Sequence, residues 1–134
     1  MAENALPTPV YWSFTVSGEP TLRDKINQWC ETRGFRPGVS YEEATTTRNL
    51  RRVAKVPGLY TLIFTNDDVF VGMANDFATA LENQPEEWHS EISEVRLMPR
   101  SKSGLALVHE AVQLQQEVQK KGFTLHQLPE GTGH

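Results

Sequence analysis

Two β-type runs joined by a short turn constrain the fold of this chain more than any other feature. Leu59–Thr65 and Asp68–Gly72 are rich in β-branched and aromatic residues, which is the composition of paired strands. Asn66 and Asp67 lie between the runs, and both residue types favour tight turns. The segment therefore predicts an antiparallel hairpin.

The patterns that follow the hairpin add one strand and two helices. Ile92–Met98 alternates well enough to form a third strand of the same sheet. Residues 76–84 predict a short helix capped by Asn75 or Asp76, and residues 105–121 have the clearest helical period in the chain. The predicted buried stripe of that long helix consists of Leu107, Val108, Ala111, Leu114, Gln115 and Val118. We therefore predict an α+β fold in which helices cover a three-stranded antiparallel sheet (59–65, 68–72, 92–98).

The residues before the hairpin are predicted to form an extension that packs on this core. Val10–Val16 has the composition of a strand, and Leu22, Ile26 and Trp29 lie on one face of a helix that Gly34 ends. The predicted organisation is a flexible arm (1–8), an N-terminal strand and helices (9–55), an α/β core (56–126) and a flexible tail (127–134).

A second N-terminal helix carries most of the basic residues of this extension. It is predicted to begin at Ser40, which can form a capping box with Glu43, and to run through roughly Lys55. Four cations on it share one face at i, i+3, i+4 and i+7, namely Arg48, Arg51, Arg52 and Lys55. Such a face is either an ordinary solvated surface or a docking patch for nucleic acid or an acidic partner. A second basic group consists of Arg96, Arg100 and Lys102.

Charge and cysteine content count against several classes of function. The 134 residues contain 13 Lys and Arg against 17 Asp and Glu, a net charge of −4, which argues against a protein that binds nucleic acid through bulk positive charge. A single cysteine excludes an intrachain disulfide and a multi-cysteine zinc site. Without a long apolar run or a secretory signal, we expect no membrane contact and a cytoplasmic location.

Residues 57–72 resemble the two-strand core of the GIY-YIG nuclease family. Gly58-Leu59-Tyr60 stands where that family has its first tripeptide, and Phe70-Val71-Gly72 stands where it has its second. Asn75-Asp76-Phe77 then opens a helix as the family's TNNL segment does. The resemblance covers about residues 56–122 and implies the family's fold and a metal-dependent DNA endonuclease. A plain packing interpretation stays open, in which the two glycines are turn residues and the two aromatic residues are cross-strand partners.

The resemblance also implies a degenerate active site. Members that cut DNA use a tyrosine from each tripeptide, an arginine in the next helix and a metal-binding glutamate late in the long helix. Tyr60 and Glu117 stand at two of these positions, but the second tyrosine is Phe70 and the arginine position falls on Thr79 or Ala80. Losing one preorganised charge-stabilising group typically costs about 100- to 1,000-fold in rate.

The local charge also argues against a nuclease, because residues 73–95 contain six acids and no Lys or Arg. We therefore expect a degenerate nuclease-like module that binds a protein partner or nucleic acid through the four cations of residues 48–55, with no certain cofactor. One alternative is an active endonuclease in which Glu117 and Tyr60 bind Mg²⁺ or Mn²⁺ and Arg48 or Arg51 supplies the guanidinium. A purely structural subunit of an assembly is the other alternative.

Overall fold

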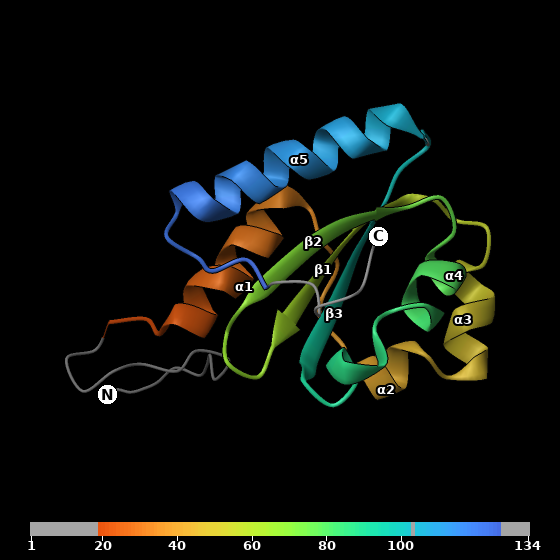
Figure 1. The fold of residues 1–134 in the computed structure, drawn as a ribbon, viewed down its shortest axis with the longest axis horizontal. Helices are drawn as coiled ribbons and strands as arrows, with labels where there is room; N and C mark the ends of the chain where they lie inside the picture. The colour runs from red at the N-terminus through yellow and green to blue at the C-terminus, as the bar shows by residue number, and fades with distance from the viewer. Residues whose placement is uncertain (1–18, 103, 127–134) are drawn as a thin grey trace, which may run out of the picture.

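The computed structural model describes residues 19–102 and 104–126. The predicted arm (1–8), the predicted strand Val10–Val16 and the predicted tail (127–134) lie outside these residues. The elements in chain order are α1 (Leu22–Arg33), α2 (Tyr41–Ala44), α3 (Thr47–Val53), β1 (Gly58–Phe64), β2 (Val69–Ala74), α4 (Phe77–Glu82), the 3-10 helix η1 (Glu86–Trp88), β3 (Ile92–Pro99) and α5 (Leu105–Lys120) (Figure 1). The predicted α+β fold with a three-stranded antiparallel sheet is confirmed.

β1 is the central strand of the sheet, and it pairs antiparallel with β2 on one side and with β3 on the other. The predicted hairpin is present. Its turn is closed by a hydrogen bond from the Asp67 N–H to the Phe64 carbonyl (2.8 Å), and Asp67 adopts a positive φ of 69°. The Asn66 side chain accepts a hydrogen bond from the Asp68 N–H (3.0 Å). Asn and Asp tolerate this left-handed turn geometry better than most residues.

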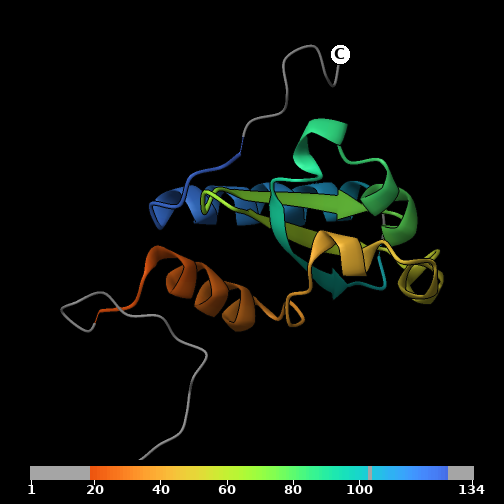
Figure 2. The ribbon, with the colours of Figure 1, turned by 90° about the horizontal axis from the view of Figure 1, so that it is seen from below.

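The alternation of β1 divides the core into two layers, one on each face of the sheet. Leu59 and Ile63 face α1 and α5, whereas Tyr60, Leu62 and Phe64 face α2, α3, α4 and η1. Figures 1 and 2 show α1 at one end of the molecule and α3 at the other. Because successive side chains of β1 project from opposite faces, a residue of one layer and a residue of the other are separated by the thickness of the sheet.

The predicted single helix from Ser40 to Lys55 is wrong, because the chain forms two short helices there. The Ser40 hydroxyl does cap α2, where it accepts from the Glu43 N–H (3.1 Å). The Thr46 hydroxyl then caps α3, in a threonine run that favours caps and turns over helix interiors. α3 ends at Val53, and Lys55 has a positive φ of 63°. Lys55 is therefore not at the predicted i+7 position of a helical face.

The buried stripes of α1 and α5 are narrower than predicted. Leu22 is the first residue of α1 and is 44% exposed, whereas Ile26 and Trp29 are buried as expected. On α5 the buried positions are Leu107, Ala111, Leu114 and Val118. Val108 lies one residue from this line, a rotation of about 100° on a helix, and is 41% exposed. Gln115 is partly buried and donates a hydrogen bond to the Val71 carbonyl (2.7 Å).

Across the part of the chain that the structure describes, no helix combines the length and the apolar character needed to span a bilayer.

Candidate functional site

Tyr60 is buried on the α4 side of β1 and its phenol already has a partner. The residue is 7% exposed, and its oxygen accepts a hydrogen bond from the Gln84 side-chain amide (3.1 Å). The same amide donates to the Ala80 carbonyl (2.8 Å), which fixes Gln84 against α4. Burial raises the pKa of the Tyr60 phenol above its ordinary value. The phenol is therefore held neutral and is poorly placed to activate a water molecule.

The two tripeptides of the hairpin pack against one another around the Tyr60 ring. Gly72 is the direct cross-strand partner of Tyr60, and a Cβ at Gly72 would lie 2.6 Å from the ring carbon Cζ of that tyrosine. Phe70 pairs with Leu62 instead, so its ring meets Tyr60 diagonally, with centroids 6.1 Å apart. The glycine and the two aromatic residues thus have a packing role that needs no chemistry.

Glu117 lies on the opposite face of the sheet from Tyr60. It projects from α5 toward α1, where its Oε1 forms an ion pair with the Arg33 Nε (2.7 Å) and accepts a hydrogen bond from the Trp29 indole N–H. Because α5 packs on the face of Leu59 and not on that of Tyr60, the two residues cannot ligate one metal ion. The hypothesis of a shared Tyr60–Glu117 metal site is therefore corrected. Among residues 19–102 and 104–126, no three His, Cys, Asp or Glu side chains are grouped as a metal site.

The position at which a nuclease of this kind has an arginine carries no positive charge. Thr79 is exposed on α4, and Ala80 beside it is partly buried. Asp76 caps this helix and accepts from the backbone N–H groups of Ala78 and Thr79. The backbone N–H of Lys55 has the largest effect in lowering the pKa of the Asp76 carboxyl, and the N–H groups of Thr79 and Ala78 lower it further. The start of α4 therefore holds a carboxylate where phosphate binding would need a cation.

Four cations form what we call the α3 basic face, which consists of Arg48, Arg51, Arg52 and Lys55. All four side chains are exposed. Within the described ranges none of them has an acidic group at ion-pair distance. Leu50 and Val53 are partly buried and pack against the layer that contains Tyr60. The three arginines of α3, and Lys55 in the turn after it, are thus exposed and have no ion-pair partner among the described residues.

The second basic group of the sequence is used inside the fold. Arg96 is 5% exposed and donates to the Arg36 carbonyl (3.2 Å) and the Asn27 side chain (3.0 Å). Arg100 and Lys102 both pair with Glu110, at 2.7 Å and 3.1 Å. The Arg100 guanidinium hydrogen-bonded to Glu110 lowers the pKa of that carboxyl. This group is therefore not a free binding surface.

A groove of about 300 Å³ adjoins the α3 basic face, and no pattern in the sequence predicts it. Its rim carries Arg36, Glu43, Asn49 and Arg52. Its apolar lining consists of Pro37, Val39, Ala44, Val53, Leu81, Val95 and Leu97. Residues 36–39 reach the groove because they pair with the outer edge of β3, through Arg36 N–H to Leu97 carbonyl (2.9 Å) and Val39 N–H to Val95 carbonyl (3.1 Å). The structure thus places next to α3 a largely apolar depression whose lining also includes two arginines and the carboxylate of Glu43.

No protein-family model, curated protein or solved structure matches this chain.

Proposed function

We propose that this domain is a non-catalytic interaction module that binds an acidic protein segment through the α3 basic face. The observation that carries the proposal is the set of four exposed cations with no acidic partner in the described parts of the chain. In a protein with a net charge of −4, a local positive surface of this kind attracts and orients an acidic partner. The strand-strand-helix-strand-helix succession of residues 58–120 supports a nuclease-like fold used as a scaffold.

The groove next to Arg52 favours a protein segment over nucleic acid as the partner. Its apolar lining suits a hydrophobic side chain, which an acidic peptide can supply beside its carboxylates and a phosphate backbone cannot. α3 also packs against α4, and the exposed acids Glu82, Glu86 and Glu87 follow on α4 and η1. A long polyanion lying across α3 would meet these carboxylates, which reduces the gain from counterion release.

The proposal predicts that two arginines control binding of an acidic, Leu-containing peptide. We expect Arg51→Gln/Arg52→Gln to weaken binding by about tenfold or more, because each exposed charge contributes to the attraction and Arg52 borders the groove. Fluorescence anisotropy of a labelled Glu-rich peptide with two leucines measures this. The matched control, Lys120→Gln/Lys121→Gln, removes the same charge from the other end of the molecule and should change affinity less than about twofold.

Two further probes distinguish the partner classes. An all-Glu peptide of equal length should bind more weakly than the Leu-containing peptide, since it leaves the groove empty. A short DNA duplex should bind more weakly than either peptide at physiological salt. Tighter binding of the duplex, with a steep dependence on salt, would replace the protein partner by nucleic acid. Equal losses in the arginine and lysine double variants would refute a specific role for the α3 basic face.

Loss of catalytic geometry predicts that the purified chain does not nick DNA in Mg²⁺ or Mn²⁺. Tyr60 is buried, Phe70 lacks a hydroxyl, and Glu117 lies on the other face of the sheet. Conversion of supercoiled to nicked plasmid, and cleavage of a branched duplex, measure the activity. Metal-dependent nicking that both Tyr60→Phe and Glu117→Ala abolish would establish the endonuclease alternative and overturn the non-catalytic module.

A further inference from the structure

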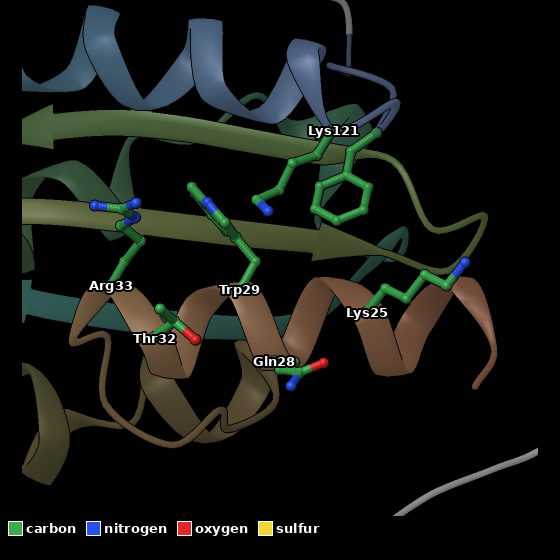
Figure 3. A pocket seen from close by; sticks show the side chains of 7 residues that line it. Lys25, Gln28, Trp29, Thr32, Arg33 and Lys121 are labelled. Atoms are coloured by element: carbon green, nitrogen blue, oxygen red, sulfur yellow. The ribbon is translucent and has the colours of Figure 1, made fainter. Parts of the chain in front are cut away.

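A second pocket, of about 420 Å³, lies between α1 and the segment that follows α5. We call it the Trp29 pocket. α1 contributes five of its residues, which are Lys25, Gln28, Trp29, Thr32 and Arg33. Lys121 and Phe123 form the remaining wall (Figure 3). The pocket is at the opposite end of the molecule from α3 (Figure 1).

Local structure explains why these residues meet. The five α1 residues are spaced at i, i+3, i+4, i+7 and i+8 from Lys25, so they share one helical face. The chain turns back after α5 at Gly122, which has a positive φ of 87° and therefore a conformation suited to glycine. That turn brings the buried Phe123 ring against Trp29, with centroids 6.5 Å apart. The acidic Glu31 of α1 is absent from the lining.

The lining carries three cations and no carboxylate. Beside the pocket, Glu117 forms an ion pair with the Arg33 Nε (2.7 Å) and accepts a hydrogen bond from the Trp29 indole N–H, so the charge of Arg33 is compensated. Lys25 and Lys121 have no ion-pair partner in residues 19–102 and 104–126. About two positive charges thus remain uncompensated around one pocket of an acidic protein.

The ion pair with Glu117 also orients the Arg33 guanidinium, one of the donors of the pocket. The ion pair of Arg33 with Glu117 is made at Nε, so the terminal nitrogens of the guanidinium can direct N–H groups toward a ligand. Figure 3 shows the Arg33 and Trp29 side chains rising from α1 toward α5, and the Lys121 side chain descending from the end of α5 toward Trp29. Gln28 and Thr32 add a neutral amide and a hydroxyl at the α1 side.

We infer that the Trp29 pocket binds the phosphate group of a small phosphomonoester. A phosphomonoester is close to a dianion at neutral pH, so it gains more than a singly charged carboxylate from a lining that carries three cations and no carboxylate. Guanidinium and ammonium groups are donors that phosphate takes readily, and Figure 3 shows the Arg33 and Lys121 side chains on the two sides of Trp29, with the Lys25 side chain pointing away along α1. The pocket volume is in the range of small-ligand sites, and Trp29 and Phe123 line it where the organic part of the ester would rest.

The inference is tested by following backbone amide NMR signals of the full chain during titration with inorganic phosphate or phenyl phosphate, at ionic strength held constant with chloride. We expect saturable shifts concentrated in residues 25–33 and 121–123, and tighter binding of phenyl phosphate because its ring adds apolar contact. Lys121→Gln should weaken phenyl phosphate binding about tenfold. Lys120→Gln removes a neighbouring exposed charge outside the lining and should change affinity less than about twofold.

Three results would overturn the inference. Equal weakening by Lys121→Gln and Lys120→Gln would mean that phosphate senses only general charge. Shifts that fail to saturate, or that spread over α3, would mean that the Trp29 pocket holds no anion. Equal affinities for inorganic and phenyl phosphate would refute the ester and leave a site for the free ion. The Arg51→Gln/Arg52→Gln variant should bind phenyl phosphate normally, so this test is independent of the α3 basic face.

Discussion

Trp88→Ala is expected to lower the free energy of unfolding by about 3–5 kcal/mol, the range for removing a large aromatic side chain from a core. Trp88 is 2% exposed. Its ring meets those of Phe64, Phe70 and His126, each with centroids 5.1 Å apart and in an edge-to-face arrangement. No single neighbour can fill the space that the indole leaves, because these three rings are held by β1, β2 and the segment after α5. Urea unfolding followed by far-ultraviolet circular dichroism measures the loss.

Two matched variants test whether this loss comes from packing. Glu87→Ala changes the adjacent, exposed residue of η1 and should alter stability by less than about 0.5 kcal/mol. Trp88→Phe keeps an aromatic ring, so its loss in free energy of unfolding should lie between those of Glu87→Ala and Trp88→Ala. A loss of less than about 1 kcal/mol in Trp88→Ala would show that the indole does not anchor this layer of the core.

Local sequence signals were sufficient for most of the elements described. Two β-type runs joined by an Asn-Asp turn predict the hairpin. An apolar period that continues to Lys120 predicts α5. Each signal depends on residues close together in the chain, so it can be recognised without the tertiary fold. The break between α2 and α3 also has a local cause, because Thr46 of the threonine run caps α3. The helical pattern of the whole segment 40–55 nevertheless predicted one continuous helix.

The candidate site was harder to predict, because its geometry depends on which face of the sheet each helix covers. The order of motifs suggests that Tyr60 and Glu117 could act together, yet neither the hairpin nor the period of α5 says that α5 packs on the Leu59 face. Likewise, Trp29 and Glu117 are 88 positions apart and form a hydrogen bond. The ion pair of Arg100 with Glu110 was likewise not predicted, because the sequence indicated only that Arg100 belongs to a basic group.

Gly58→Ala is expected to lower the free energy of unfolding by about 3 kcal/mol, at the upper end of the cost of overpacking a core. A Cβ at Gly58 would lie 2.4 Å from the Met98 carbonyl oxygen, 2.6 Å from the Phe77 ring and 2.8 Å from the Cα of Pro99. Two of these atoms belong to the β3 backbone. β1 is the central strand and pairs on both sides, so it cannot move away from β3 without disturbing β2.

Gly72→Ala provides the comparison, because its Cβ would meet the Tyr60 side chain, at 2.6 Å, rather than backbone. We expect Tyr60→Leu to relieve part of the cost of Gly72→Ala and none of the cost of Gly58→Ala, as a double-mutant cycle measured by urea unfolding can show. Equal relief of both would mean that Tyr60, not the β3 backbone, confines Gly58. If the expected pattern holds, close packing alone requires the glycine of each tripeptide, and the presence of these motifs carries no evidence for catalysis.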